Sequence, residues 1–392
     1  MDNVKELKLK RSRKVILWIA LSLFGLSIVG ILLIYFLWLK PGISKPLAEA
    51  LNLPTRQGSL TNSTEGSEST QVGVYPTIEE NKFTATQSSQ GEPDEQPATP
   101  TSTKEVPVYV KPTVPVNKAP ICGKDSEWII LLIGIDYQGE GYLYGLADVI
   151  RLARIDFING TINMIGIPRD LLVDVPEQSL TVEGPIKINQ AYLFGTKGMG
   201  HYSGSGYGAG SLAEVIQYNL GVSADHYAVI NFDTFVKFID AIGGIEVDLP
   251  QAVTDPELGD YSAGKQWLSG ERALKLARIR TLYSDAFRVS NQTIIMRAVL
   301  NKMMTPSMIL KMPGLLIRFK DAFLTDLSIE KLTGLGLCFL NKFDSGNLKT
   351  HTIPPELLTS DSVFIPTLSN RAFVYQWDER LINWLHETLV SE

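Results

Sequence analysis

Charged residues that could together bind a metal ion and a phosphate group stand at the ends of three apolar runs. Asp136 follows the first run, Asp148 precedes the second, and Arg169 and Asp170 follow the third. Magnesium is commonly held in proteins by one or two carboxylates together with phosphate oxygens. A guanidinium group matches a phosphate with two parallel hydrogen bonds. The four residues therefore predict a site for a metal-bridged phosphate, provided that the fold brings them together.

Two further arginines follow a short predicted helix over residues 268–276. They are Arg278 and Arg280. In an extended chain, residues two apart face the same way, so both guanidinium groups would lie side by side while Ile279 points into the core. Such a pair is costly unless an anion lies between the two charges, and phosphate is the anion that matches the guanidinium fork.

Arg288 and Gln292 lie four residues apart at the start of an apolar-periodic stretch. That pattern predicts a helix, and residues at this spacing share one helix face. We therefore expect both side chains to approach one site from the same helix.

Three predicted strands position the first set of charged residues. Residues 128–135, 149–157 and 161–167 are apolar runs of strand length, and Asn159-Gly160 is a strong hairpin signal between the second and the third. If the second strand also folds back on the first, all four charged residues converge on one edge of a sheet. The alternative is that each of them caps its own strand in solvent.

Two other patterns bear on the helices of the domain. An apolar stripe at helical spacing is either core packing or the wall of a pocket for a lipid tail; it consists of Phe232, Phe235, Phe238 and Ile239. A capping-box pattern, Ser211 followed by Glu214, predicts a helix that starts at Ser211.

The N-terminal region predicts a membrane anchor. Residues 15–39 form an uncharged, apolar run that is long enough to span a bilayer as one transmembrane helix. The tail over 1–14 is basic, so it is expected to face the cytoplasm, with everything after the run outside it. Residues 40–122 are rich in Ser, Thr, Pro, Gln and Glu and are expected to form a disordered linker.

Charge and cysteine content limit the choice of partners and compartment. The formal net charge is −6, and the cytoplasmic tail has no room for a DNA-binding domain, so no nucleic-acid partner is expected. The two cysteines, Cys122 and Cys338, are either isolated thiols or one disulfide in an oxidising compartment.

Several stretches resemble the LytR-CpsA-Psr family of bacterial envelope proteins, in the order in which that family has them. They are LLIGID (131–136), AD (147–148), IPRD (167–170), KINQAY (187–192), DAIGGIEV (240–247) and LSGERALKLARIR (268–280), followed by Asp285, Arg288 and Gln292. Each stretch is short, but together they are specific.

The resemblance implies the fold and the activity. The fold would be α/β, a three-layer α/β/α sandwich around a central mixed β-sheet. The activity would be transfer of a glycopolymer phosphate from a polyprenyl-pyrophosphate-linked glycan to peptidoglycan or another envelope acceptor, assisted by Mg²⁺. The catalytic domain would span 123–305, and 306–392 would be a C-terminal extension that packs on it.

The resemblance also assigns the site residues by position. The metal-associated aspartates would be Asp136 and Asp148. The catalytic residues would be Arg169, Asp170, Arg278 and Arg280. The substrate-binding residues would be Arg169, Arg278, Arg280, Arg288, Gln292 and Asn189. Asp170 would either orient an arginine or accept a proton from the acceptor hydroxyl.

Two positions depart from the pattern of the family. Leu146 stands where the family usually has an arginine, and Asn291 stands where it often has one. Loss of a preorganised donor can lower a reaction rate by about 100-fold or more. The departures motivate an alternative function, a non-catalytic envelope protein that binds polyprenyl phosphates or glycolipids in the same groove.

Overall fold

The structure is a computed structural model that describes residues 40, 44–54, 106–112, 120–137, 142, 144–279, 285–342 and 345–391. The predicted basic tail and the predicted transmembrane run over 15–39 lie outside these residues. Within the described part of the chain, no helix combines the length and the hydropathy needed to cross a bilayer.

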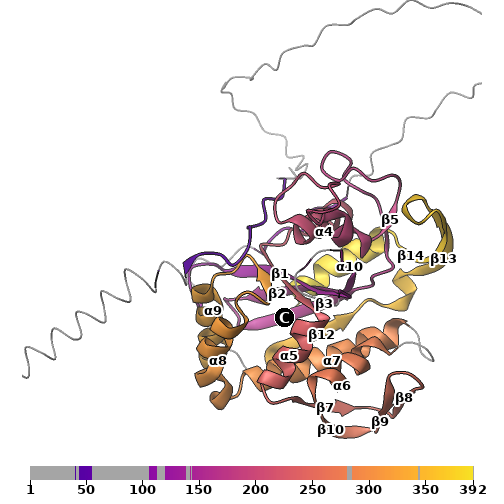
Figure 1. Cartoon of the computed structure of the whole chain (residues 1–392). Helices are drawn as coiled ribbons and strands as arrows, with labels where there is room; N and C mark the ends of the chain where they lie inside the picture. Colours follow the sequence, from indigo (N-terminus) through magenta and orange to yellow (C-terminus); the bar gives the residue numbers. More distant parts are fainter. Residues whose placement is uncertain are drawn as a thin grey trace, which may run out of the picture.

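A six-stranded mixed sheet forms the centre of the fold (Figure 1). In spatial order, its strands are β11 (Leu324–Thr325), β6 (His226–Asn231), β1 (Glu127–Ile135), β2 (Ala147–Asp156), β3 (Thr161–Ile167) and β12 (Leu348–Thr352). β2 pairs antiparallel with β1 and with β3, whereas β6 runs parallel to β1 and β12 parallel to β3. The three predicted strands are thus confirmed as the middle of the sheet.

The hairpin between β2 and β3 fixes the edge on which charged residues can meet. In its turn, Gly160 has a φ of +68°, which a residue without a side chain adopts at little cost. The ladders place Ile150 opposite Ile167 and Ile135 opposite Ala147. The end of β1, the start of β2 and the end of β3 therefore share one edge of the sheet, as the sequence predicts.

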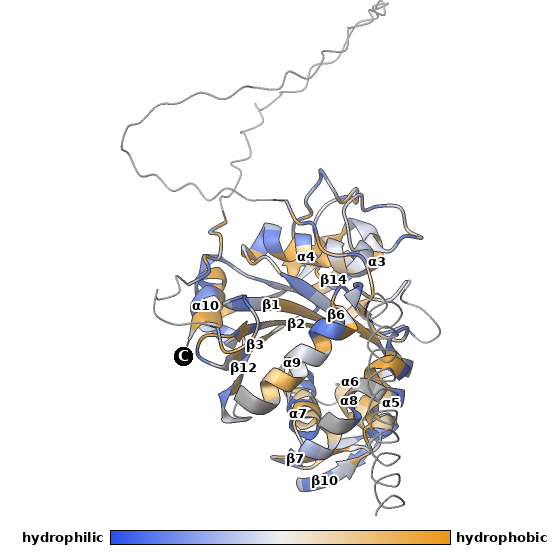
Figure 2. Cartoon of the chain, turned by 90° about the vertical axis from the view of Figure 1, so that its left-hand side faces the viewer, coloured by the Kyte–Doolittle hydropathy of each residue, from blue (hydrophilic) through white to orange (hydrophobic). Residues whose placement is uncertain are grey.

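Helices cover both faces of the sheet, which gives the expected three layers (Figure 1). One face carries α3 (Gln190–Gly195), α4 (Tyr207–Leu220) and α10 (Glu379–Val390). The other carries α5 (Phe232–Ala241), α6 (Gly270–Arg278) and α7 (Asp285–Met303), with α8 (Pro306–Phe319) and α9 (Ile329–Lys342) beside them. Apolar residues of β1 and β2 lie between the two helix layers (Figure 2).

The start of α4 differs from its prediction. The helix begins at Tyr207, and Ser211 lies fully buried inside it. Glu214 accepts a hydrogen bond of 2.9 Å from the Tyr202 hydroxyl. A Cβ on Gly195 would come within 2.3 Å of the Ser211 side chain, so α3 and α4 pack at close range. Tertiary packing therefore extends the helix upstream of the capping-box signal.

Short ladders extend from the sandwich. They are β4 (Leu172–Val173) with β5 (Ile186–Lys187), β7 (Ile245–Leu249) with β10 (Gly264–Leu268), β8 (Val253–Asp255) with β9 (Gly259–Tyr261), and β13 (Thr359–Ile365) with β14 (Asn370–Gln376). Single 3₁₀ turns lie at Ser345–Asn347, Pro355–Leu357 and Pro366–Leu368. Residues of β7 and β10 share a hydrophobic core with α5, α6 and α7, so this ladder braces those three helices.

The C-terminal region over 306–392 is part of the central sheet and does not only pack on the domain. It supplies β11 and β12, the two outer strands of the central sheet. Its final helix, α10, buries Leu381, Leu385 and Leu389 in the main core. α10 follows β14 directly and starts after the N-cap Asp378. Strands and helices from before and after residue 305 therefore build one domain.

Two stretches within the expected linker lie against the domain. Tyr109 is buried and donates its N–H to the Gly221 carbonyl over 2.9 Å. Residues 44–54, indigo in Figure 1, run past α9, and the Glu49 carbonyl accepts a hydrogen bond of 2.8 Å from the Tyr227 hydroxyl. Leu51 also packs against the main core. The structure therefore differs from a disordered linker over 40–122 at these two stretches, because their large side chains offset the ordering entropy by burial, and it differs again at Ile121, whose N–H donates to the Phe157 carbonyl.

The two cysteines form a disulfide between Cys122, ahead of β1, and Cys338 in α9. Cys122 packs beside Trp128 and Phe157 on the face of the sheet that α9 approaches. Of the two alternatives left open by the sequence, the disulfide is the one that the fold contains.

Candidate functional site

An ion-pair network links the edges of β2 and β3. Arg169 Nη1 donates to Asp148 Oδ1 over 2.7 Å, and Arg169 Nε donates to Asp170 Oδ2 over 3.4 Å. Lys187 Nζ in β5 donates to Asp170 Oδ1 over 2.8 Å. The four side chains are only 13–22% exposed, so water screens these ion pairs less than it screens a surface pair.

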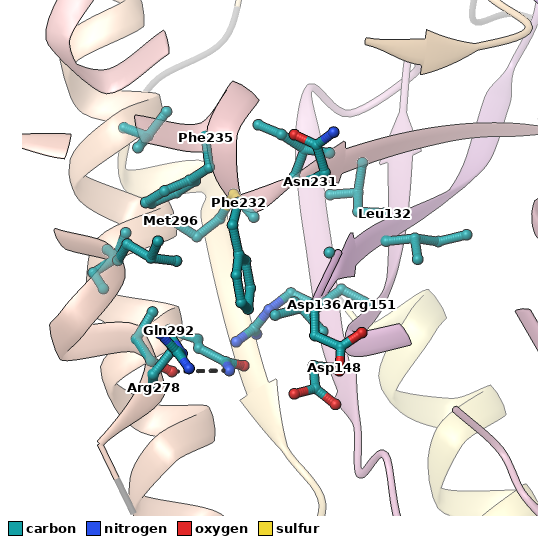
Figure 3. A pocket seen from close by; sticks show the side chains of 18 of the residues that line it. Leu132, Asp136, Asp148, Arg151, Asn231, Phe232, Phe235, Arg278, Gln292 and Met296 are labelled. Atoms are coloured by element: carbon teal, nitrogen blue, oxygen red, sulfur yellow. Dashed lines mark hydrogen bonds between the residues drawn. The ribbon is translucent and has the colours of Figure 1, made fainter. Parts of the chain in front are cut away.

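Asp136 lies beside this network at the end of β1. Its Oδ1 accepts a hydrogen bond of 2.7 Å from the Leu146 N–H. Burial raises the pKa of the Asp136 carboxyl; the Leu146 hydrogen bond opposes that shift, and the Asp148 carboxylate adds to it. Figure 3 shows both carboxylates at the same end of a cavity. The predicted convergence of the four charged residues is confirmed, and the alternative of separate strand caps in solvent is wrong.

Asp136 and Asp148 are the two carboxylates at the charged end of the cavity and could hold a metal ion there, and Glu257 also lines the cavity. No group of three or more His, Cys, Asp and Glu residues within the described chain is arranged to hold one. Burial is the main cause of the raised pKa of Asp136 and the Asp148 carboxylate adds to it, and a cation bound between the two would favour their ionised forms. The donor set fits a hard cation such as Mg²⁺ that takes its remaining ligands from phosphate and water.

Asp170 and Asn189 lie behind the cavity wall. Neither is among the residues that line the cavity. The carboxylate of Asp170 is bonded to Arg169 and Lys187, which supports orientation of Arg169 rather than proton transfer. The Asn189 backbone donates to the Arg169 carbonyl and accepts from the Ala147 N–H, both over 3.2 Å. Asn189 thus fixes the backbone on either side of the charged edge.

Arg278 reaches the cavity from the helix layer. It is the last residue of α6, and its guanidinium carbon lies 5.1 Å from the centre of the Phe232 ring. Ile279 is fully buried, as predicted. Arg280 lies outside the described residues, so the pairing of the two guanidinium groups stays a prediction.

Arg288 and Gln292 line the cavity from α7, as their spacing predicts. Arg288 is 4% exposed. Gln292 Nε2 donates to the Ala277 carbonyl over 3.3 Å, which links α7 to the end of α6. The two helices therefore present Arg278, Arg288 and Gln292 to one space.

That space is a cavity of about 750 Å³ between the sheet and helices α5, α6 and α7. Charged residues and Gln292 gather at one end of it, and mainly apolar residues, with Asn231 beside them, at the other (Figure 3). The apolar lining includes Leu132, Phe235, Phe238, Met296, Val299, Leu300 and Phe323. The aromatic stripe of α5 also lines the cavity, so it is a pocket wall as well as core. The cavity suits an amphipathic ligand with an anionic head.

Arg151 is a lining residue that the sequence did not single out. It lies in the middle of β2 and is 1% exposed. The signal that could have found it is a charged residue inside a run of buried strand residues, because such a charge needs a partner.

The folded part of the chain is similar to known proteins. The family model named LytR_cpsA_psr matches residues 84–388. The chain is 27% identical over 218 residues to the polyisoprenyl-teichoic acid–peptidoglycan teichoic acid transferase TagU of Enterococcus faecalis, covering 55% of this chain and 66% of that protein. It is 30% identical over 223 residues to the enzyme of the same description, TagV, of Bacillus subtilis, covering 55% and 53%.

A solved structure agrees with these matches. The crystal structure of B. subtilis TagV has a TM-score of 0.53 and 25% sequence identity, over 68% of this chain and 97% of that one. The matched region spans between about half and two thirds of the length of the two curated relatives.

Proposed function

The chain belongs to the LytR-CpsA-Psr family, and we propose that it transfers a phosphate-linked glycopolymer from a polyprenyl-pyrophosphate carrier to peptidoglycan or another envelope acceptor. The relatives named as teichoic acid transferases support a reaction of this class. The observation that carries the proposal is the single cavity in which a charged end continues into an apolar interior. A lipid pyrophosphate has the same division between an anionic head and an apolar tail.

The apolar interior accounts for recognition of the lipid. Phe235, Phe238 and Met296 face the cavity from two different helices. Burial of a tail against such walls contributes about 0.8 kcal/mol per methylene group removed from water. Lipid binding therefore places the pyrophosphate at the charged end, beside Arg169 and Arg278.

The chemical step is the attack of an acceptor hydroxyl oxygen on the phosphorus that carries the glycopolymer. A new phosphorus–oxygen bond forms, and the bond from that phosphorus to the bridging oxygen breaks. The polyprenyl monophosphate leaves with the bonding electrons, and the hydroxyl proton passes to solvent. Arg169 and Arg278 donate hydrogen bonds to phosphate oxygens, where negative charge builds up in the transition state.

Asp136 and Asp148 would hold Mg²⁺ together with oxygens of the pyrophosphate. Bound Mg²⁺ supplies further neutralisation of the phosphate charge. Asp148 also fixes Arg169 through their 2.7 Å ion pair, so the same carboxylate would serve the metal and the guanidinium group.

The disulfide supports a place for the domain outside the cytoplasm. Disulfides persist in oxidising compartments and are rare in the reducing cytosol. The Cys122–Cys338 bond therefore agrees with an external domain. The apolar run over 15–39 would hold it at the cell membrane as a single-pass anchor, with the N-terminus in the cytoplasm.

Release of the lipid monophosphate tests the proposal. Full-length protein in detergent is supplied with a polyprenyl-pyrophosphate-linked glycan, a peptidoglycan fragment and Mg²⁺. We expect release by the wild type and an approximately 100- to 1000-fold slower rate for Arg278→Ala. Arg272→Ala is the matched control, because Arg272 also lies in α6, stacks on Tyr261 at 4.7 Å and lies outside the cavity.

The same assay distinguishes the alternative function. Tight binding of the lipid without turnover by the wild type would support a non-catalytic lipid-binding protein. An equal rate for Arg278→Ala and Arg272→Ala would exclude Arg278 from the reaction.

A further inference from the structure

Arg151 lies under the cavity, at the centre of the sheet. It pairs with Leu132 on β1 and with Gly166 on β3. A Cβ on Gly166 would come 3.4 Å from Arg151 Nη1, so the glycine leaves room for the guanidinium between the sheet and α7. Figure 3 shows Arg151 at the level between the charged Asp148 and the apolar Phe235.

The hydrogen bonds of Arg151 are incomplete. Nη2 donates to the Val289 carbonyl in α7 over 3.1 Å. Nε and Nη1 are buried and have no hydrogen-bond partner. None of the ion pairs found in the described part of the chain includes Arg151. Burial lowers the pKa of the guanidinium to about 10, so it remains charged at neutral pH without a counter-ion among the described residues.

A second buried arginine on the same strand shows the contrast. Arg154 lies three residues further along β2 and is 5% exposed. Its Nε donates to Glu127 over 2.7 Å, and its Nη2 donates to Asp156 over 3.1 Å. The fold therefore supplies carboxylates to one buried arginine of β2 and leaves the other unpaired toward the cavity.

An unpaired buried positive charge is unfavourable unless an anion binds next to it. Arg151, Arg169, Arg288 and Gln292 each line both the main cavity and a narrow recess that adjoins it beside β3 and α7. The recess brings three guanidinium groups to one place. One acidic residue, Asp148, lines it with them and offsets part of their positive charge. The recess has no room for even a water molecule, so a phosphate attracted by these groups would lie in the main cavity beside them.

We propose that the Arg151 guanidinium, whose Nε and Nη1 have no partner, binds the phosphate that is attached to the lipid. This proposal rests on the proposed function. In a lipid pyrophosphate that enters with its tail in the apolar interior, the phosphate on the lipid lies deeper than the phosphate on the glycan. Arg151 is a buried guanidinium at the level between the charged end and that interior, so it holds the phosphate that leaves with the lipid.

The proposal predicts that Arg151 binds the substrate and the released lipid monophosphate alike. The test measures the binding of farnesyl monophosphate, farnesyl diphosphate and inorganic pyrophosphate to the full-length protein by calorimetry, together with the melting temperature without ligand. The variants are Arg151→Met, which removes the charge, Arg151→Lys, which keeps it without the guanidinium fork, and the control Arg154→Met.

We expect Arg151→Met to bind both farnesyl phosphates about 10- to 100-fold more weakly, the loss that corresponds to charge-assisted hydrogen bonds. Its ligand-free melting temperature should not fall, because an unpaired charge has been removed. Arg151→Lys should bind with intermediate affinity. Arg154→Met should lower the melting temperature, because it leaves two buried carboxylates unpaired, and should keep the affinity of the wild type.

Three results would overturn the proposal. Wild-type affinity of Arg151→Met for both lipids would remove the contact, while leaving the proposed function intact. If Arg151→Met weakened the binding of inorganic pyrophosphate but not of the two lipids, Arg151 would bind an anion other than the lipid phosphate. Failure of the wild type to bind either lipid would overturn this proposal and the proposed function together.

Discussion

Arg169 and Asp148 lie 2.7 Å apart, Nη1 to Oδ1, across the ends of two antiparallel strands. The pair joins a group that suits phosphate to a group that suits a cation, and Asp170 holds the other side of the guanidinium. This geometry separates the roles of the two aspartates, because one faces the cavity and the other lies behind it.

Asp148→Asn should abolish the dependence of transfer on magnesium. The amide keeps the size of the side chain but removes the charge that a metal needs, so Mg²⁺-dependent transfer should fall by about 100-fold or more. Binding of the lipid pyrophosphate without metal should persist. Transfer rates across a magnesium titration check this, with Asp248→Asn as the control, because Asp248 is exposed on β7. An unchanged magnesium dependence would remove Asp148 from the metal site.

Asp170→Asn should affect stability and catalysis through different partners. Lys187 would lose its ion pair, which should lower the free energy of unfolding by about 1–3 kcal/mol, and Arg169 would lose one of its two anchors. The double variant Asp170→Asn/Lys187→Met should regain stability but not the transfer rate. Urea unfolding and the transfer assay together check this. Full activity of the double variant would contradict a positioning role for Asp170.

Removal of the disulfide should destabilise the domain. Cys122→Ser/Cys338→Ser opens a covalent loop between residues separated by 216 positions, which should lower the free energy of unfolding by about 2–4 kcal/mol. Urea midpoints of the variant and the wild type, with and without a reductant in the wild type, measure the effect. Equal midpoints for all three samples would contradict a stabilising bond.

The stability of the domain should fall in mild acid, in part through His386. His386 Nε2 donates to the Leu220 carbonyl over 2.9 Å, and burial lowers the pKa of the imidazole below its ordinary value. The folded protein therefore favours neutral His386, whereas the unfolded chain protonates it near pH 6.5. The stability that this group contributes is present above about pH 6.5 and is lost as the pH falls through the folded-state pKa.

Unfolding in urea between pH 7 and pH 5 checks the contribution of His386. The slope of stability with pH from one proton is at most about 1.4 kcal/mol per pH unit. His386→Gln keeps a donor for Leu220 and should have a shallower slope than the wild type. An identical slope would assign the acid sensitivity to other groups, such as His351, whose pKa burial also lowers.

The charged edge was predictable because its determinants are local. Strand ends and the turn at Gly160 can be read from short windows, and two antiparallel pairings then fix where Asp136, Asp148 and Arg169 meet. The burial of Arg151 was not predictable in this way. It depends on Val289, which is 138 residues away in the sequence and whose helix covers the strand.

Two other differences also come from long-range packing. α4 starts early because glycines let α3 and α4 approach closely, which outweighs a local capping signal at Ser211. Tyr109 lies in a segment whose average composition is that of a linker, and its burial depends on contacts with Gly221 and with His386 in α10. A composition averaged over 40–122 conceals single side chains of this kind.

Because residues 44–54 pack on the domain, the free linker between the domain and the proposed membrane anchor is short. Pro46 forms a backbone bridge with Ser328 just ahead of α9, so the chain is attached to the domain only a few residues after position 39. An extended chain covers about 3.3–3.6 Å per residue, and the intervening residues therefore reach on the order of 20 Å. With 15–39 in the bilayer, as proposed, the domain would rest near the lipid headgroups. The lipid-linked donor could then move from the membrane leaflet into the cavity without exposing its hydrocarbon chain to water.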